Sequence, residues 1–344
     1  MSDQRTEISS LGEFGLIEHL TKNIELQNAS SIVGVGDDAA VVDHFGKQTV
    51  ISNDLLIEGV HFDLAYTPLK HLGYKSVIVN LSDIYAMNAI PTQIVLSIGI
   101  SNRFSVEALD EFYDGVYTAC AKYGADLIGG DTNSSQKGFI ISVTSIGEVT
   151  PDKYVKRSTA TKGDLICVSG DLGAAYVGLL FLEREKKIYL ENPGVQPDLE
   201  GESYVIGRLL KPEARKDIVE FFAKENITPT SLMDISDGLS SEILHICKDS
   251  NLGCVLYEDK IPIAEETRNA AFKFKIDPTA CALSGGEDYE LLFTINQSDY
   301  DKLLLNGNIS VVGYMAEPEL GSTIITKGGT KHAITAQGWK HLEQ

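Results

Sequence analysis

Short apolar runs and longer segments of helical period alternate through the first half of the chain. The β-branched runs that predict strands lie at 50–51, 94–96 and 140–146. Residues 105–123 predict the clearest helix, because Ser105 is a good N-cap, apolar residues recur at helical spacing and Gly124 follows the last turn. Residues 70–87 predict a second, more apolar helix. This order of elements predicts an α/β half.

A polar and basic segment without a hydrophobic period, residues 151–163, separates this half from the next. It marks the predicted boundary between a domain at 1–150 and a domain at 151–344. The elements predicted in the second half are a strand at 165–168, helices around 175–180, 213–224 and 239–248, and strands at 291–294 and 310–312. Prolines and glycines at 191–202 predict a loop. The expected architecture is therefore mixed α/β with two domains.

Composition agrees with a folded protein of this size. The 344 residues are long for one domain, and 43% hydrophobic with 23% charged residues is typical of a globular chain. The formal net charge of −20 argues against nucleic acid and anionic membranes as partners, since phosphate binding there rests on Lys and Arg. Solubility accounts for most such acidity, so only specifically placed acids are candidates for cation binding.

Cysteine usage and the lack of long apolar segments favour the cytoplasm. The five cysteines are odd in number and none has CxxC spacing, which argues against a zinc site and a disulfide framework. A reducing compartment fits best. The polar N-terminus predicts no signal peptide, and no run is long enough for a transmembrane helix.

Acidic residues recur beside small or polar residues at the edges of apolar elements. These segments are GDD at 36–38, SND at 52–54, NLSD at 80–83, GGDT at 129–132, DISDG at 234–238 and GGED at 285–288. Any one of them alone is an ordinary turn or cap. Their recurrence predicts that acids from several element ends converge on one site, where a cation neutralises them. Magnesium takes such oxygen ligands together with substrate phosphates.

Other kinds of phosphate site do not fit the sequence. Residues 34–40 match a loose GxGxxA dinucleotide pattern, but two adjacent carboxylates would stand where a pyrophosphate needs backbone N–H groups. The chain has no GxxxxGK[ST] loop and no HRD or DFG motif. A phosphotransferase of this sequence would therefore depend on metal-centred alignment and charge neutralisation.

Taken in order, the motifs resemble those of a known family along almost the whole chain. They are Gly12-Glu13-Phe14, GVGDDAAV at 34–41, SNDLLIEGVHF at 52–62, VNLSDIYAMNA at 79–89, LIGGDT at 127–132, Lys156-Arg157-Ser158 with Gly163-Asp164, MDISDGL at 233–239 and LSGGEDYELLF at 283–293. The family is that of thiamine-monophosphate kinase, in the superfamily of aminoimidazole ribonucleotide synthetase. The resemblance implies phosphoryl transfer from ATP to thiamine monophosphate, direct and in line, with several magnesium ions.

The resemblance also implies roles for individual residues. The implied magnesium ligands are Asp38, Ser52, Asn53, Asp54, Asp83, Asp131, Asp234 and Asp237. Among them, the implied catalytic residues are Asp54, Asp83 and Asp131. The implied ATP contacts are Gly130, Asp131, Arg157 and Ser236, and the implied contacts to thiamine monophosphate are His61, Glu287 and Trp339. Asn53 departs from the family, which usually has threonine there, so an amide or backbone carbonyl would have to act as that ligand.

Each substrate contact has a structural alternative. His61 could be a satisfied loop histidine, although the motif around it favours ligand contact. Trp339, the only tryptophan, could close the C-terminal core or stack on a cationic thiazolium. Arg157 could be a solvated side chain, but a cation in so acidic a chain favours a phosphate contact. Glu287 could belong to a solvated turn or neutralise the positive charge of the substrate.

The implied fold is PurM-like. Its N-terminal α/β domain binds ATP and magnesium and forms a homodimer through its sheet, and its C-terminal α/β domain lies over it. One alternative is another member of this superfamily, with aminoimidazole ribonucleotide synthetase the nearest, although GGEDYELLF and VNLSDIYAMNA fit the thiamine enzyme better. The other is a non-catalytic cation-binding protein, which has no need of acids from so many distant segments.

Overall fold

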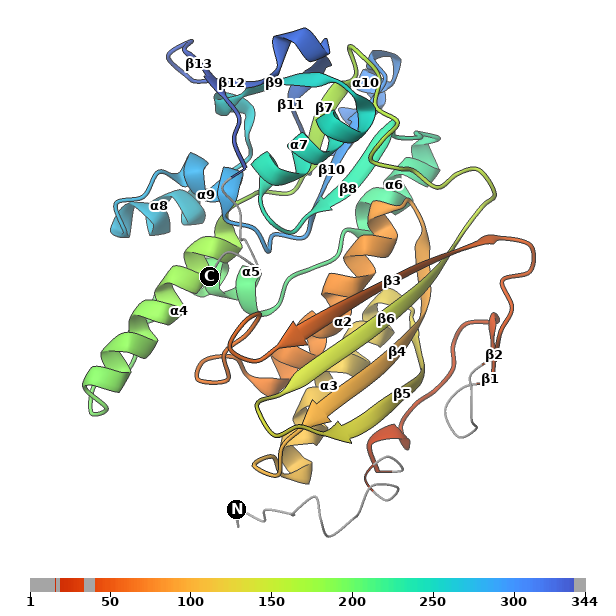
Figure 1. The fold of residues 1–344 in the computed structure, drawn as a ribbon, viewed down its shortest axis with the longest axis vertical. Coiled ribbons are helices and arrows are strands. Elements are labelled where there is room, and N and C mark those ends of the chain that lie inside the picture. Colours follow the sequence, from red (N-terminus) through yellow and green to blue (C-terminus); the bar gives the residue numbers. More distant parts are fainter. Residues whose placement is uncertain (1–15, 17–18, 34–40, 337–344) are drawn as a thin grey trace. The chain divides into compact units, whose positions relative to one another are not determined.

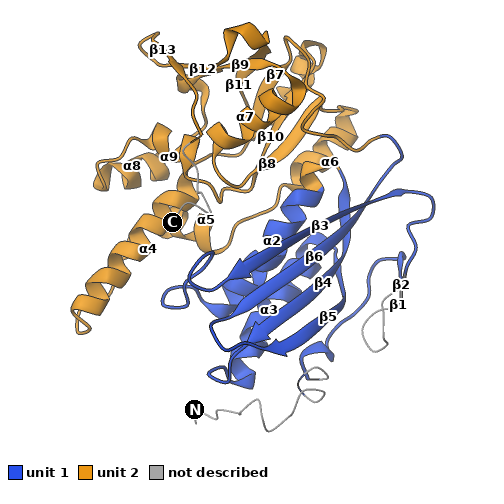
Figure 2. Ribbon diagram, viewed as in Figure 1, with its two compact units in different colours: residues 1–84, 89–152 blue, residues 85–88, 153–344 orange. Residues whose placement is uncertain are grey.

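The chain divides into two compact units, each with its own sheet. The computed structural model describes residues 16, 19–33 and 41–336 (Figure 1). The first unit contains residues 1–84 and 89–152, and the second contains residues 85–88 and 153–344 (Figure 2). Both units mix helices with a sheet, which confirms the α/β class.

A four-stranded sheet and two long helices form the first unit. The strands in spatial order are β3 (Gln48–Ile57), β6 (Ile140–Val149), β4 (Ile90–Ile100) and β5 (Asp126–Ser134), so β3 and β5 are the edges. Helices α2 (Leu69–Ala86) and α3 (Val106–Tyr123) cover one face (Figure 1). A separate ribbon pairs β1 (Ser31–Val33) with β2 (Val41–Val42).

Strict alternation of burial along β6 shows which face the helices cover. Ile141, Val143 and Ser145 are fully buried, whereas the residues between them are partly exposed. Helix α2 lies against this face, since the Ser145 hydroxyl donates to the Asn80 carbonyl oxygen at 2.9 Å. Because side chains alternate across a strand, every second residue of β3 and β4 also faces these helices.

The second unit is built on a seven-stranded sheet that is antiparallel except between β12 and β9. In spatial order its strands are β13 (Lys331–Ala333), β12 (Ser322–Ile325), β9 (Gly253–Tyr257), β11 (Ile309–Ala316), β7 (Leu165–Ser169), β10 (Glu290–Ile295) and β8 (Ser231–Ile235). Its helices are α4 (Ala174–Glu191), α5 (Ser203–Leu210), α6 (Lys216–Glu225), α7 (Leu239–Ser250), α8 (Glu265–Lys273), α9 (Pro278–Ser284) and α10 (Tyr300–Leu303). Strand β10 is buried along its whole length, so the core of this unit surrounds it.

The clearest predicted elements are confirmed with their caps. The Ser105 hydroxyl accepts from the Ala108 N–H at 3.3 Å, and Gly124 ends α3 in the left-handed region at φ 73°. The helix predicted at 213–224 begins later, at Lys216.

The position predicted for the SND segment, at the end of a strand, is wrong. Residues 52–54 lie in the middle of β3, whose pairing with β6 continues to Ile57. An edge strand can keep polar side chains in its ladder because they alternate between a covered and an open face. The apolar run that ends at Ile51 therefore marked only the first part of the strand. For the same reason Gly129–Thr132 lie inside β5.

Candidate active site

Two carboxylates meet where the middle of β3 faces α2. The Ser52 hydroxyl donates a hydrogen bond to the Asp83 carboxylate. Asp54 lies two residues further along β3, on the same face, and its backbone N–H donates to the Asn80 side chain at 2.9 Å. Asn80 is fully buried and had not been predicted as a site residue. Helix α2 thus supplies both a carboxylate and the amide that fixes the strand beside it.

The electrostatics of this pair favour the binding of a cation. Burial and, as a smaller cause, the neighbouring charge of Asp83 together raise the pKa of Asp54 to about 6. A bound cation would favour the charged form of both groups. The donor set consists only of oxygen atoms, which is what magnesium prefers. Asp54, Asp83 and Ser52 therefore fit a magnesium ion.

The side chain of Asn53 points to the other face of β3. Its amide nitrogen donates to the Val143 carbonyl at 2.9 Å and contacts the Ser142 and Thr144 hydroxyls at 3.1 and 2.9 Å, all on β6. The structure thus does not bring the Asn53 side chain together with Asp54 and Asp83. If Asn53 is a metal ligand, as the resemblance implies, the ligand would have to be its backbone carbonyl.

Gly130 and Asp131 lie at the opposite edge of the sheet. Asp54 is in register with Val143, Leu96 and Gly130, whereas Asp131 belongs to the next row, with Ser97, Ser142 and Leu55. Alternation assigns the two rows to opposite faces, and three strand spacings separate the edges by about 14 Å. One magnesium ion, with ligands at about 2 Å, cannot reach both carboxylates within one chain.

Gly130 also has a structural reason to be glycine. A Cβ atom there would lie 2.0 Å from the Leu96 carbonyl oxygen. A side chain is excluded by the pairing of β5 with β4, whether or not ATP binds here. At Gly129, by contrast, a Cβ would meet nothing within 4 Å.

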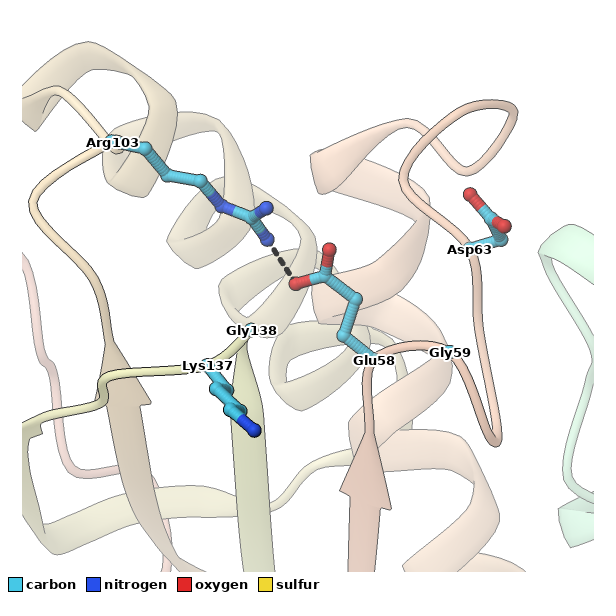
Figure 3. A pocket seen from close by; sticks show the side chains of 6 residues that line it. All are labelled: Glu58, Gly59, Asp63, Arg103, Lys137 and Gly138. Atoms are coloured by element: carbon cyan, nitrogen blue, oxygen red, sulfur yellow. Dashed lines mark hydrogen bonds and ion pairs between the residues drawn. The ribbon is translucent and has the colours of Figure 1, made fainter.

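The loop after β3 carries His61. Its Nδ1 accepts from the Ile57 N–H at 3.0 Å, so the neutral ring carries its proton on Nε2. The same loop supplies Glu58, Gly59 and Asp63 to a cavity of about 270 Å³ (Figure 3). Arg103 and Lys137 also line it, and Figure 3 shows the Arg103 guanidinium directed at the Glu58 carboxylate, with which it forms an ion pair.

A second group of predicted residues meets in the second unit. Asp234 is the next-to-last residue of β8, which is buried along its whole length, and Ser236 and Asp237 form the turn before α7. The Glu287 N–H donates to the Ser236 carbonyl at 2.7 Å. At Gly286 a Cβ would lie 2.4 Å from the same oxygen, so the two loops touch through their backbones. Two predicted metal ligands, Asp234 and Asp237, are therefore neighbours of a predicted ATP contact and a predicted substrate contact, which are Ser236 and Glu287.

Glu242 is a buried acid of this group that the sequence analysis missed. Its side chain is 2% exposed, and Oε1 accepts from the Asp237 N–H at 2.8 Å. Burial raises its pKa to about 8, opposed by the backbone hydrogen bonds and reinforced by the charges of Asp237 and Asp234. Its position in the first turn of α7 was visible in the sequence, as an acid that can reach back to an N–H before the helix.

Arg157 lies apart from this turn. It is exposed, and its carbonyl oxygen accepts from the Ser250 hydroxyl at 3.2 Å, at the C-terminal end of α7. Ser236 precedes the other end of this helix, which is about 18 Å long. The structure thus does not bring these two predicted ATP contacts together.

Two predicted site residues, Asp38 and Trp339, lie outside the described residues. Within residues 16, 19–33 and 41–336, no three His, Cys, Asp or Glu side chains come close enough to hold one metal ion. Among the described acids, Asp54 lies near Asp83, Asp234 and Asp237 both lie near Glu242, and Asp131 lies on the opposite edge of the four-stranded sheet from Asp54.

Comparisons with known proteins show which family the chain resembles over nearly its whole length. Residues 36–149 match the family described as AIR synthase related protein, N-terminal domain. A thiamine-monophosphate kinase of Aquifex aeolicus is 34% identical over 97% of this chain and 99% of its own. The crystal structure of thiamine-monophosphate kinase from Stenotrophomonas maltophilia K279a has a TM-score of 0.79 and 29% identity, covering 94% of this chain and 98% of its own. A structure described as AaThiL complexed with AMPPCP and TMP has a TM-score of 0.74 and 31% identity, with 99% and 100% covered.

Proposed function

The chain belongs to the thiamine-monophosphate kinase family, and we propose that it transfers the terminal phosphoryl group of ATP to thiamine monophosphate, giving ADP and thiamine diphosphate. As a member of that family it is an enzyme, a thiamine-phosphate kinase with a PurM-like fold. AMPPCP is an analogue of ATP. The relative that holds it together with TMP aligns with 99% of this chain. A donor and an acceptor on one protein of this fold support direct transfer between them.

The observation that carries the proposal is the pair Asp54 and Asp83. Two carboxylates held side by side by Ser52 and Asn80, with the pKa of one raised to about 6, form a site for a divalent cation. Magnesium bound there supplies charge neutralisation to the phosphate oxygens during transfer. Asp234 and Asp237 in the second unit would hold further ions in the same way. No general base is invoked, because the accepting oxygen is already that of a phosphate.

The protein's own groups would orient both substrates. Glu287 would face the positively charged thiazolium of thiamine monophosphate, and His61 would contact the same substrate from the loop after β3. Ser236, Gly130 and Arg157 would contact ATP. Positioning of this kind supplies most of the rate acceleration in phosphoryl transfer, because little covalent chemistry is left to the enzyme.

A homodimer formed through the four-stranded sheet completes the proposal. Asp54 and Asp131 lie on opposite edges and opposite faces of this sheet, so one chain cannot bring them to one ion. A second copy whose β5 lies beside β3 would bring the two edges together. On the open face of β3, Ile51 and Leu55 are 65% and 48% exposed, which is apolar surface of the kind that a partner covers.

The setting proposed for the enzyme is the cytoplasm, with neither nucleic acid nor membrane as partner. All five cysteines are buried free thiols, which supports a reducing compartment. In the part of the chain that the structure describes, no helix has the length and apolar character needed to cross a bilayer. The net charge of −20 supports small phosphorylated substrates held through metal ions rather than polyanions.

The test is to incubate the purified protein with ATP, magnesium and thiamine monophosphate and to separate the products by chromatography. We expect thiamine diphosphate and ADP in equal amounts, and neither with Asp54→Asn. Formylglycinamidine ribonucleotide, the substrate of aminoimidazole ribonucleotide synthetase, is the comparison. ADP release with that substrate but not with thiamine monophosphate would reject the proposed acceptor. Magnesium binding without turnover of either substrate would favour a cation-binding protein.

A further inference from the structure

A buried carboxylate stands directly beside Glu287. The Asp288 side chain is 1% exposed, and its Oδ2 accepts from the Gly173 N–H at 2.7 Å. Its Oδ1 lies 3.4 Å from the Ala175 N–H. These groups open α4 and have no partner inside the helix, so Asp288 caps this helix from a distant loop. Asp288 has no part in the mechanism above.

The backbone around Asp288 has an unusual conformation. Glu287 and Tyr289 both adopt left-handed φ values, 59° and 53°. Such values cost free energy in residues other than glycine, and they persist where the surroundings impose them. The Glu287 and Tyr289 N–H groups donate to the Ser236 and Ile235 carbonyls at 2.7 and 2.9 Å. The loop is therefore held against the turn that carries Ser236 and Asp237.

The next acid along the chain, Glu290, is buried like Asp288. Glu290 is fully buried, and its two oxygens accept from Arg208 at 2.9 Å and from Arg215 at 2.8 Å. Asp288 and Glu290 are thus both buried and held by groups of the protein interior. Glu287 is the partly exposed member of this acidic run.

We propose that Asp288 is a positioning residue, which fixes Glu287 rather than itself as the carboxylate that faces the cationic ring of the substrate. The inference rests on the proposed function, because it takes a thiazolium as the partner of Glu287. Two adjacent acids carry the same charge, so charge alone does not select between them. The N-terminus of α4 distinguishes the two acids, because its N–H groups bind the shorter side chain of Asp288 in the protein interior. The substrate then meets the longer side chain of Glu287 in one fixed place.

The test compares two capping aspartates of the same unit. Asp288→Ala removes the contact to α4, and Asp277→Ala removes an ordinary cap, since Asp277 accepts from the Thr279 N–H at 2.9 Å at the start of α9. We expect Asp288→Ala to weaken calorimetric binding of thiamine monophosphate about tenfold and to leave ATP binding unchanged, because a misplaced carboxylate loses most of one charge-assisted contact. Asp277→Ala should leave both affinities unchanged.

A double-mutant cycle separates positioning from stability. If Asp288 acts through Glu287, then Asp288→Ala in a Glu287→Gln background should weaken binding no further. Additive losses would overturn the inference. Should the alanine variant fail to fold, Asp288→Asn takes its place, because its amide keeps one acceptor but presents N–H groups to the second donor; a smaller loss with the same coupling is expected.

Hydrogen exchange gives a readout that does not depend on the substrate. Asp288→Ala should speed exchange of the Glu287 and Tyr289 amides about tenfold or more, and Asp277→Ala should not. Unchanged protection of these amides would overturn the inference even in an active enzyme. A wild-type protein that binds no thiamine monophosphate would instead reject the proposed acceptor, and the exchange result would still decide whether Asp288 holds this loop.

Discussion

Ser52 on β3 donates a hydrogen bond to the carboxylate of Asp83 on α2, 31 residues further along the chain. This bond joins the strand that carries Asp54 to the helix that carries Asp83, whose charge contributes to the raised pKa of Asp54. Both acids lie between the sheet and its helices, where burial and the charge of Asp83 disfavour ionisation of Asp54. In the metal-free protein the pair therefore costs stability, and a cation reverses that cost.

The first prediction is that Asp54→Asn stabilises the metal-free protein while it abolishes activity. The folded-state pKa is raised from 3.8 to about 6, so between these values the folded state binds more protons and stability falls as pH rises. The full cost, about 2 to 3 kcal/mol for two pKa units, is present at neutral pH. The melting temperature of Asp54→Asn without magnesium should therefore exceed that of the wild type at about pH 7.5 and match it near pH 4.

Asp131→Asn is the matched control for this change. Asp131 is exposed on an edge strand, so its neutralisation should leave the metal-free melting temperature within about a degree of the wild type. It should still reduce the turnover number at least about 100-fold if Asp131 is a metal ligand. A metal-free Asp54→Asn protein that melts below the wild type at neutral pH would contradict the electrostatic account.

The second prediction concerns protons released when magnesium binds. Near pH 6 about half of the Asp54 carboxyls are protonated without metal, and ligation requires the charged form. Calorimetric titrations in two buffers of different ionisation enthalpy should show up to about half a proton released per site near pH 6, and almost none near pH 8. The apparent magnesium affinity should fall as the pH drops below about 6. Equal release at both values would exclude Asp54 as the titrating ligand.

How far the sequence predicted this molecule depends on whether a contact is local. The cap at Ser105 and the left-handed Gly124 follow from neighbouring residues, and the structure confirms both. The place of residues 52–54 within β3 depends on pairing with β6, about ninety residues away, so the apolar run alone misplaced it. The opposite orientation of the Asn53 side chain has the same origin.

The buried polar partners of the site were also beyond the sequence. Asn80 stands in a motif and Glu242 follows one, but the contacts of these residues with Asp54 and Asp237 arise only from the fold. Asp288 next to Glu287 could not be told from it by charge, and the helix terminus that distinguishes them lies 115 residues earlier in the chain. Motif order singled out a set of acids, and their roles stay predictions; the different contacts that each acid makes became visible only in the structure.

The third prediction tests the dimer through its apolar surface. Ile51→Asp with Leu55→Asp places two charges on the open face of β3, where a partner would have to bury them. We expect light scattering to give twice 37.4 kDa for the wild type and 37.4 kDa for the double variant at micromolar concentration. The lost apolar burial alone should raise the dissociation constant at least about 100-fold.

The control for that experiment is an equally exposed leucine of the other unit. Leu305 is 69% exposed near the end of α10, so Leu305→Asp makes a similar change in surface charge and hydrophobicity. Its mass in solution should equal that of the wild type. A wild-type protein that is already monomeric would refute the proposed dimer, and with it the sharing of ligands between subunits.

The fourth prediction is that two inactive variants restore activity when their subunits mix. Asp54 and Asp131 occupy opposite edges of one sheet, so in the proposed dimer a complete site takes Asp54 from one chain and Asp131 from the other. Random association of Asp54→Asn with Asp131→Asn chains makes half of the dimers mixed, each with one intact site. Co-expression with two different tags should then yield about a quarter of wild-type activity, although each variant alone has almost none.

Asp54→Asn with Asp83→Asn is the matched control. These two acids lie together within one chain, and every chain of this mixture carries one of the two changes. Every site of a mixed dimer therefore lacks one acid, and no activity should return. If purified mixed dimers of the first mixture stay inactive, each chain builds its site alone, and the sharing of ligands is refuted. Recovery in the control would show that Asp54 and Asp83 of one site come from different chains.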